Sequence, residues 1–424
     1  MADLDAPMQG PPPPQAVCER PVQFSPADTG SGRARILGQR IGAVHSTELA
    51  PLSADSGPII GLDTFRSDPR FAGVDGTGYT AVVIDSGIDR DHPFFGPDED
   101  GDGVADRIIY GRDFSDNDMN ADDRNGHGTN VASIIGSSDP YYTGVAPGVN
   151  IIALKVLGDY GDGDFWDIGD ALEWTVDHVD EYNIVSVNLS LGDGQLYTAE
   201  RTGYQVGDDL EALADAGVTV VAAAGNAFYE QGSQEGVVYP AADPNTLAIG
   251  AVYDADIGEM SYRTGATAFT TAPDRITPFS QRHESITRLF APGAAIGGAG
   301  AGGGVSTYHG TSQAAPQVAG AAVLAQQMSD HYLGRRLALP EMEALLVGSG
   351  TTIGDGDDED DNVTNTGLEF TRLDVMAMAE AIVEMAGEGD DADLEVTAGG
   401  DRLVDGSTLL SSGNDYGELL IDET

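Results

Sequence analysis

The feature that most constrains the fold is an alternation of short, continuous apolar runs with segments of helical periodicity, which begins near residue 78. The apolar runs are strand candidates and lie at 80–84, 150–156, 184–190, 218–223 and 246–252. The helix candidates lie at 127–136, 166–181, 207–216, 312–329 and 372–386. Strands that are apolar at every position must be covered on both faces. The pattern therefore predicts an α/β fold with a mostly parallel central sheet and helices on both faces.

The chain has 424 residues, which is enough for one large domain with a sizeable core. Residues 1–55 are rich in Pro, Gly, Ala and Ser without a sustained period, so we expect a flexible leader. Residues 56–386 should form the main domain, and the acidic residues 387–424 a tail. Alternation around 394–404 leaves open that the tail begins a further β module. The charge run at 354–366 is expected to be a solvated loop.

The net charge of −50 excludes some classes of partner. It argues against binding to nucleic acids or anionic membranes, because like charges repel. Lys155 is the only lysine in the chain. Two explanations of this composition remain open: adaptation to high salt, or a codon bias against lysine combined with acidic loops. Cys18 is the single cysteine, so an intrachain disulfide is excluded, and we interpret it as an incidental thiol.

The sequence contains no apolar run of the roughly 18 residues that a membrane span needs. The first residues have neither a cationic region nor an apolar region of the kind found in signal peptides. Two interpretations remain open. Either the protein acts inside the cell, or the sequence begins downstream of a signal peptide.

Two segments supply a base and the anion that would orient it, each at the end of a predicted strand or the start of a predicted helix. Asp85 ends an apolar strand in VVIDSGID, and working groups of open parallel sheets gather at the carboxyl ends of strands. His127 opens a helix in NGHGTNVASIIG, between Gly126 and Gly128, which leave space on both sides of its ring. A hydroxyl nucleophile needs a base to take its proton, and the base needs an anion to orient it. Alone, Asp85 could be a capping residue and His127 a structural histidine.

Two further segments supply a nucleophile and a hydrogen-bond donor. Ser312 lies in YHGTSQAAPQVAGAA, where a turn runs into an Ala-rich helix, so its backbone N–H is available to an oxyanion. Asn226 lies in VVAAAGNAF, just after an apolar strand, and its amide could donate to the same oxyanion. The alternatives are a simple helix cap for Ser312 and a turn residue for Asn226.

The four segments, in the order Asp, His, Asn, Ser, resemble the signature blocks of the subtilase family. Further segments at 185–192, 239–252, 277–283 and 289–296 resemble later parts of that family, and the similarity covers about residues 60–386. The resemblance implies a subtilisin-like fold and a serine endopeptidase that acts on protein or peptide substrates through an acyl-enzyme. It implies an Asp85/His127/Ser312 triad with Asn226 as oxyanion donor.

The resemblance also implies where a substrate would bind. Ser190, Leu191 and Gly192 should lie beside the bound peptide, and Val238 falls where many members have Gly at the floor of the primary pocket. A valine there should narrow the pocket. We expect a monomer. The resemblance favours secretion, with the cytoplasm as the alternative compartment.

The sequence departs from the family at three positions near these segments. Asn130 stands where many members have a second His, and Gln313 and Gln317 where many have Met and His. None of the three is a triad or oxyanion position, so the expected chemistry is retained.

The segment DEDGDGVAD at 98–106 suggests a structural calcium site. Its acidic residues fall at positions 1, 3, 5 and 9 of a calcium loop and its glycine at position 6, with a carbonyl available at position 7. The expected ligands are Asp98, Asp100, Asp102, the Val104 carbonyl and Asp106. The position of the bidentate Glu of an EF-hand is occupied by Ile109, so the segment is more similar to short extracellular calcium loops. The alternative is a solvated acidic turn.

Two functions compete with proteolysis at this level. A pseudoprotease would have lost a triad residue, and none is lost. An acidic calcium-binding scaffold would use the loop at 98–106 but would leave the segments around His127 and Ser312 unexplained.

Overall fold

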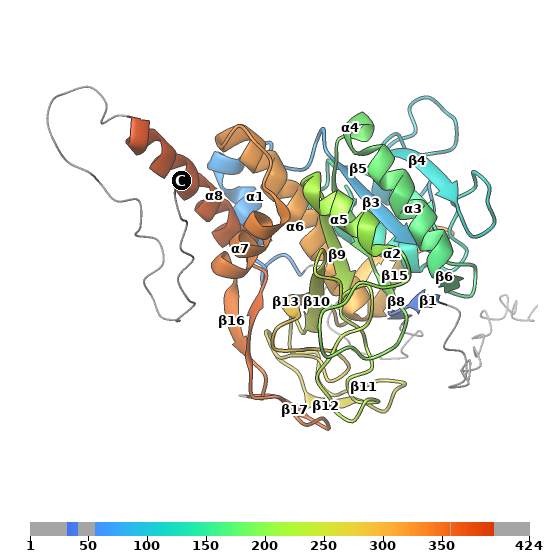
Figure 1. The fold of residues 1–424 in the computed structure, drawn as a ribbon, viewed down its shortest axis with the longest axis vertical. Coiled ribbons are helices and arrows are strands. Elements are labelled where there is room, and N and C mark those ends of the chain that lie inside the picture. The colour runs from blue at the N-terminus through green and yellow to red at the C-terminus, as the bar shows by residue number, and fades with distance from the viewer. Residues whose placement is uncertain (1–31, 41–55, 357, 394–424) are drawn as a thin grey trace, which may run out of the picture.

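A nine-stranded sheet forms the centre of the protein in the computed structural model, which describes residues 32–40, 56–356 and 358–393 (Figure 1). In sheet order the strands are β16 (Thr351–Gly354), β18 (Glu369–Arg372), β13 (Thr287–Pro292), β10 (Leu247–Val252), β9 (Thr219–Ala223), β7 (Ile184–Leu189), β3 (Thr80–Asp85), β5 (Asn150–Lys155) and β4 (Ile108–Asp113). Neighbours are parallel except β16 and β18. The predicted α/β class and mostly parallel sheet are confirmed.

Helices cover both faces of the sheet, because each central strand is apolar on both sides. Along β3, Ala81 and Val83 join one core cluster, whereas Val82 and Ile84 join the other. The first face carries α2 (His127–Gly136), α6 (Thr311–Tyr332), α7 (Leu339–Ser349) and α8 (Val375–Asp393). The second carries α3 (Phe165–Asp177) and α5 (Gly207–Asp215). Shorter helices are α1 (Leu62–Ser67) and α4 (Val179–Tyr182).

The strand candidates match β3, β5, β7, β9 and β10 to within a residue or two. The helix α7, the inner strand β13 and the outer strands β4, β16 and β18 were not predicted. Outer strands bury less of their surface, and in β4 only the first and last residues are buried, which leaves no continuous apolar run. Among the described residues, no helix is both long and apolar enough to cross a membrane.

Three small sheets lie beside the large one. The first consists of β6 (Asp162–Asp164), β1 (Arg33–Ile36) and β8 (Leu191–Gly192). The second consists of β14 (Ile296–Ala299), β15 (Val305–His309) and β2 (Gln39–Arg40). The third consists of β11 (Met260–Ser261), β12 (Thr267–Thr270) and β17 (Asp360–Asp361).

The segments expected to be a leader and a tail both contain secondary structure that the sequence did not predict. Within the predicted flexible leader 1–55, residues 33–36 and 39–40 form β1 and β2 and pair with the main domain. Backbone pairing requires no apolar run, so a Gly- and Arg-containing segment can adopt it. At the other end, α8 extends to Asp393, past the expected boundary at residue 386. Residues 1–31 and 394–424, with Cys18 and the suggested β module, lie outside the described residues.

The charge run at 354–366 is not simply a solvated loop. Asp355 is buried and its Oδ2 lies 2.9 Å from Nε of Arg282, which is also fully buried. Thr366 donates its backbone N–H to the same oxygen at 2.8 Å. A buried carboxylate needs such partners, since removing an unpaired charge from water is costly. The rest of the run includes the exposed Asp358 and Asp360.

Candidate active site

Asp85 and His127 form a buried hydrogen-bonded pair at the carboxyl end of β3. His127 donates from Nδ1 to Asp85 Oδ1 at 2.8 Å, and both side chains are fully buried. Asp85 is the last residue of its strand, and His127 is the first residue of α2. With its proton on Nδ1, the imidazole presents Nε2 as a hydrogen-bond acceptor, and Nε2 has no hydrogen-bond partner among the described residues.

The glycines beside His127 allow this close approach. Gly126 precedes α2 with a φ of 96°, a conformation that glycine adopts without strain. A Cβ atom on Gly128 would lie 2.2 Å from the carbonyl oxygen of Gly87 and 3.1 Å from Asp85 Oδ1. The start of α2 therefore fits against the end of β3 only with glycine at this position.

Ser312 lies in the first turn of α6 and is fully buried. Its Oγ donates to the carbonyl oxygen of Ser190 at 3.1 Å, and Ser190 Oγ donates back to the Ser312 carbonyl at 2.9 Å. Among the described residues, no hydrogen bond joins Ser312 Oγ to His127 Nε2. The structure thus pairs Asp85 with His127 and Ser312 with Ser190, and no hydrogen bond connects the two pairs among the described residues.

Asn226 is held at the start of α6 in one orientation. Its Oδ1 accepts the backbone N–H of Thr311 at 2.9 Å and the Thr311 hydroxyl at 3.0 Å. Its Nδ2 has no hydrogen-bond partner among the described residues, and a Cβ on Gly310 would lie 2.8 Å from it. The amide N–H groups are therefore available beside the helix start that carries Ser312.

Leu191 and Gly192 form β8, and Val238 packs against this strand. A Cβ atom on Gly192 would lie 2.5 Å from Val238 Cγ2, and one on Gly225 would lie 2.9 Å from Val238 Cγ1. The buried valine side chain therefore fills the space between two glycine backbones.

A profile of the subtilase family matches residues 76–367. This chain belongs to the subtilase family. Its fold agrees with that assignment: the crystal structure of a cold adapted subtilisin-like serine proteinase has a TM-score of 0.56 and 30% identity, over 76% of this chain and 98% of that chain. The subtilisin-like fold implied by the sequence motifs is thus confirmed.

Curated subtilases are similar over part of their length. Alkaline serine exoprotease A of Vibrio alginolyticus is 32% identical over 281 residues, which cover 66% of this chain and 43% of the relative. Subtilisin E of Bacillus subtilis (strain 168) is 32% identical over 255 residues, which cover 59% of this chain and 56% of the relative. This subtilase spans about half the length of the curated relatives it matches.

Two of the departures from the subtilase motifs compensate each other. Gln313 donates from Nε2 to Asn130 Oδ1 at 3.3 Å, and Asn130 donates from Nδ2 to the Ser306 hydroxyl at 3.2 Å. The third, Gln317, donates to the carbonyl of Pro292 at 2.6 Å. All three side chains are buried and have partners, so they act as packing and hydrogen-bonding residues behind the site.

Sequence reasoning missed Asp123, which fixes the start of α2. Its Oδ1 accepts from the N–H groups of Asn125 and Gly126 at 2.9 and 2.8 Å, and its Oδ2 accepts from the N–H and hydroxyl of Thr129 at 2.9 and 2.7 Å. Ser86, next to Asp85, donates its hydroxyl to Asp123 at 3.0 Å. Burial raises the pKa of Asp123. The available signal was an aspartate four residues before a helix-opening histidine, a position suited to helix capping.

Lys155 was also missed as part of the site. Its ammonium donates to the carbonyl oxygens of Ser86 at 2.8 Å and Leu157 at 2.9 Å, and the side chain is buried. The only lysine of the chain thus holds the backbone that follows Asp85. Its place at the end of the apolar strand 150–156 was the available signal.

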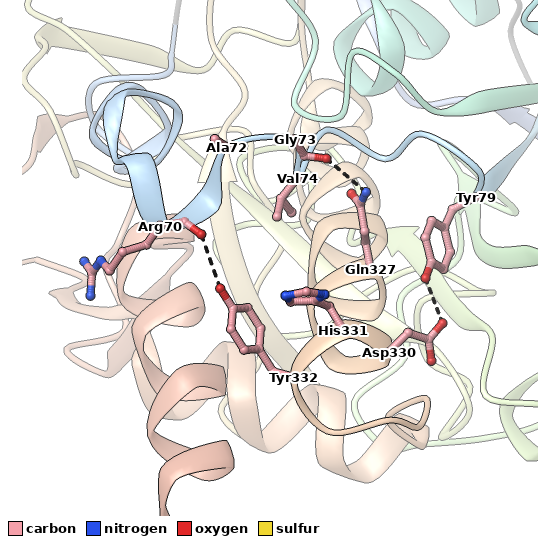
Figure 2. A pocket seen from close by; sticks show the side chains of 9 residues that line it. All are labelled: Arg70, Ala72, Gly73, Val74, Tyr79, Gln327, Asp330, His331 and Tyr332. Atoms are coloured by element: carbon pink, nitrogen blue, oxygen red, sulfur yellow. Dashed lines mark hydrogen bonds between the residues drawn. The ribbon is translucent and has the colours of Figure 1, made fainter.

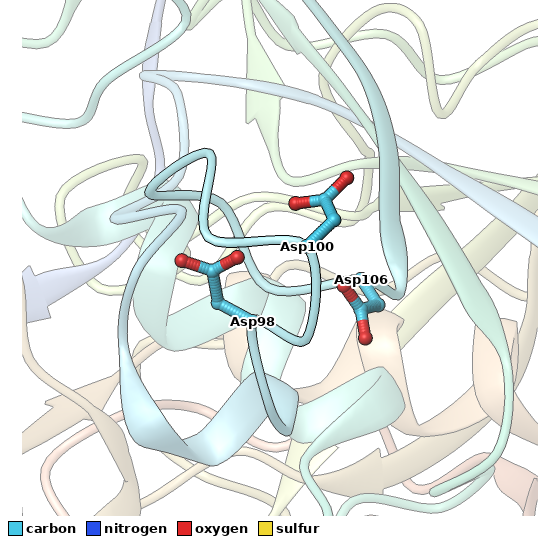
Figure 3. Close-up of side chains that lie close together, drawn as sticks. All are labelled: Asp98, Asp100 and Asp106. Carbon is cyan, nitrogen blue, oxygen red and sulfur yellow. The ribbon is translucent and has the colours of Figure 1, made fainter.

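The acidic loop brings three of its four predicted aspartates together (Figure 3). Asp98, Asp100 and Asp106 each offer a carboxylate oxygen, and these atoms lie within 4.8 Å of one another. Asp102 lies outside this cluster, and its Oδ1 accepts the N–H of Val104 at 2.8 Å. The Gly103 N–H holds the pKa of Asp98 below its usual range. An exposed set of ionised oxygens suits a hard cation such as calcium.

An open pocket of about 400 Å³ lies at the far end of α6 (Figure 2). It is separated from Ser312 by roughly 25 Å along the helix axis. The Tyr79 hydroxyl donates to Asp330 at 2.8 Å, and the Tyr332 hydroxyl donates to the Arg70 carbonyl at 3.2 Å. The two tyrosine hydroxyls thus already have hydrogen-bond partners within the pocket wall. This arrangement does not suggest a second reactive centre.

Proposed function

We propose that this subtilase is a serine endopeptidase with Asp85, His127 and Ser312 as its triad and Asn226 as oxyanion donor. The observation that carries the proposal is the buried hydrogen bond from His127 Nδ1 to Asp85, which leaves Nε2 as an unpaired acceptor. An imidazole in this tautomer can take a proton from a serine hydroxyl. Ser312 is the candidate nucleophile, because it lies at the positive end of α6 with an oriented amide beside it.

The mechanism follows from these roles. Ser312 turns its hydroxyl from Ser190 to His127, and Oγ attacks the substrate carbonyl while Nε2 takes the proton. Asp85 keeps Nδ1 protonated and stabilises the imidazolium. Asn226 Nδ2 and the Ser312 backbone N–H donate to the oxyanion. The imidazolium then protonates the leaving amine, and water, deprotonated by His127, hydrolyses the acyl-enzyme.

Specificity is the next part of the proposal. Substrate pairs with Ser190, Leu191 and Gly192, and Val238 narrows the primary pocket. The support is the close packing of Val238 against the backbone of Gly192 and Gly225. Small or medium apolar residues at P1 should therefore be preferred to Phe and Tyr. A peptide library led by large aromatic residues at P1 would contradict this preference.

Calcium is proposed as a structural ion in the loop at 98–106. Asp98, Asp100 and Asp106 would supply side-chain ligands, since their oxygens already cluster. Asp102 and the Val104 carbonyl would have to join on binding. The ion would neutralise the negative charge of the loop between Asp85 and His127 and so would restrain the segment that links them.

We propose protein or peptide substrates, a monomeric state and no nucleic-acid partner. The support for the last is the net charge of −50, which repels polyanions and also suits a protein that works at high salt. Secretion remains the favoured location and the cytoplasm the alternative, because residues 1–31 lie outside the described residues.

The test of the proposed chemistry is hydrolysis of casein by the wild type and by Ser312→Ala, with a fluorophosphonate to label the nucleophile. We expect turnover and labelling to disappear in Ser312→Ala. Ser329→Ala is a matched control, because Ser329 is buried in the same helix at its distant end. Full activity of Ser312→Ala, or labelling of another serine, would refute the triad.

A further inference from the structure

The charge run at 354–366 is anchored to the core through the fully buried Arg282. Arg282 donates from Nε to Asp355 Oδ2 at 2.9 Å and from Nη2 to Asn365 Oδ1 at 3.3 Å, so both ends of the run meet at one guanidinium. Its Nη1 donates to the carbonyl oxygen of Ser280 at 3.1 Å. A planar guanidinium with acceptors on all three of its nitrogens is fixed in orientation. Arg282 therefore holds both ends of the run against the backbone at Ser280.

The segment 279–282, which includes Arg282, lies along the loop that carries Asn226. Gln281 donates its backbone N–H to the Gly225 carbonyl oxygen at 2.8 Å. Ala227 donates its backbone N–H to Gln281 Oε1 at 3.3 Å. The residues directly before and after Asn226 are thus both bonded to Gln281, the neighbour of Arg282.

Arg282 also contacts this loop itself. Its guanidinium carbon lies 3.7 Å from the centroid of the Phe228 ring, and Phe228 is fully buried. The Phe228 N–H donates to the Phe279 carbonyl oxygen at 3.1 Å. A cation over an aromatic face attracts it most strongly where water is excluded. A displacement of Arg282 would therefore reach Phe228, two residues after Asn226.

The loop 225–228 has little space in which to shift. A Cβ atom on Gly225 would lie 2.1 Å from Gln281 Oε1. On its other side, Gly225 donates its N–H to the Thr311 hydroxyl at 3.1 Å, and Asn226 accepts the Thr311 N–H at 2.9 Å. The loop is thus held between the start of α6 and Gln281, and the Gln281 side leads through Arg282 to Asp355.

Asp355 supplies the negative charge that a buried Arg282 needs. Burial lowers the pKa of the Arg282 guanidinium, whereas the charge of Asp355 raises it. A buried cation that loses its paired anion is costly, so water or a new side-chain position must compensate for the loss. Either change would occur where Arg282 contacts Phe228 and adjoins Gln281.

We propose that Asp355 and Arg282 are positioning residues of the candidate active site, which hold the loop 225–228 so that Asn226 Nδ2 is directed to the developing oxyanion. This inference rests on the proposed function. The pair acts through hydrogen bonds and packing alone, and it forms or breaks no covalent bond. Because the oxyanion exists only in the transition state, a misplaced Asn226 should lower kcat and leave KM nearly unchanged.

The first test compares Asp355→Asn with Asp358→Asn, the same substitution at an exposed residue of the same charge run. Hydrolysis of a peptide p-nitroanilide with Leu at P1 gives kcat and KM. In Asp355→Asn we expect kcat to fall about 10–100-fold, less than the loss of about 10²–10³ on deleting an oxyanion donor. Asp358→Asn should retain the wild-type kcat. A raised KM with unchanged kcat in Asp355→Asn would contradict the proposal.

A double-mutant cycle with Asn226→Ala shows whether the effect passes through Asn226. In the Asn226→Ala background, we expect Asp355→Asn to lower kcat by less than about threefold, because residues that act as a unit are not additive. A general loss of structure at the site would instead multiply with the loss from Asn226→Ala. The full Asp355→Asn effect in that background would therefore overturn the inference.

Thermal unfolding of each variant in the Ser312→Ala background shows whether it folds. If Asp355→Asn does not fold, Phe228→Leu replaces it in both experiments, with the same expected results. This variant keeps the pair of Asp355 and Arg282 but removes the ring beneath the guanidinium. A wild-type kcat in the folded variant would overturn this inference and leave the proposed function intact. Casein hydrolysis by Ser312→Ala would overturn the proposed function.

Discussion

Carboxylates occur in two contrasting regions of the molecule, the buried candidate active site and the exposed loop at 98–106. Asp123 accepts hydrogen bonds from Ser86, 37 residues away, as well as from the start of α2. Asp98 is exposed and accepts only from the N–H groups of its own loop, at Gly101, Asp102 and Gly103. The hydrogen bonds of Asp123 depend on the folded core, whereas those of Asp98 depend on local backbone turns. Mutations should therefore have large effects in one region and small effects in the other.

The largest expected effect is on stability, at the buried Asp355. Asp355→Ala removes the carboxylate that pairs with the fully buried Arg282, so we expect a loss of about 3–5 kcal/mol in the free energy of unfolding. Asp358→Ala is the matched control, because Asp358 is exposed and lies 3.2 Å from Arg275. Its expected loss is about 0–1 kcal/mol. Urea unfolding in the Ser312→Ala background measures both, and similar losses would contradict the contrast between buried and exposed carboxylates.

The next effect concerns catalysis at Asn226. Asn226→Ala removes the unpaired amide donor, so kcat should fall by about 10²–10³. The Thr311 N–H also loses its acceptor, and thermal unfolding of the variant must show that the fold is intact. Asn120→Ala, at an exposed asparagine, is the control and should leave kcat unchanged. A folded Asn226→Ala enzyme with wild-type kcat would exclude the oxyanion role.

A smaller effect concerns His309, which is buried next to the site. Burial lowers the pKa of His309 from 6.5 to about 4, and its Nδ1 accepts the Ala295 N–H at 2.9 Å. The unfolded chain takes up a proton below about pH 6.5, whereas the folded protein does not until near pH 4. Stability is therefore lost as pH falls through this window. By about pH 5 the loss from this residue should be about 2 kcal/mol relative to pH 7.

His309→Gln should lack this part of the pH dependence. Unfolding of wild-type and His309→Gln chains, both carrying Ser312→Ala, would be compared at the two pH values. If the two chains lose the same stability between pH 7 and pH 5, His309 is not the responsible group.

Calcium binding to the exposed loop should change the free energy of unfolding less than the substitutions above. At about 1 mM calcium and a dissociation constant of about 10⁻⁴–10⁻³ M, the folded state should gain about 0.4–1.4 kcal/mol. Asp100→Asn combined with Asp106→Asn should remove most of this gain, because both residues belong to the cluster. Asp102→Asn, outside the cluster, should remove less. Thermal unfolding of the Ser312→Ala chain in EGTA and in calcium measures the shift, and its absence in the parent would favour a solvated acidic turn.

Salt is expected to have the smallest effect on stability for each charged residue involved. At a net charge of −50, nearby surface carboxylates repel one another, and added salt screens that repulsion. The melting temperature should rise as KCl increases toward the molar range. A flat or falling curve would instead support the explanation by codon bias.

The sequence predicted the central elements well and the outer ones poorly. The runs that became β3 and β7 are buried at every position, so their composition alone indicated parallel strands covered on both faces. The motifs around Asp85 and His127 similarly indicated two residues that the structure joins by a hydrogen bond. By contrast, Asp355 lay in a charge run, and only its distant partner Arg282 made burial acceptable.

By itself, the sequence determined the family, the α/β fold and the residues that carry the expected chemistry, because these depend on local periodicity and on motifs in a fixed order. The tertiary structure alone decided that Asp102 stays outside the aspartate cluster and that Ser312 bonds to Ser190. It also decided that β1 pairs with β8 and β2 with β15. Each of these outcomes depends on which distant backbone lies opposite a residue, and no local pattern of side chains encodes that proximity.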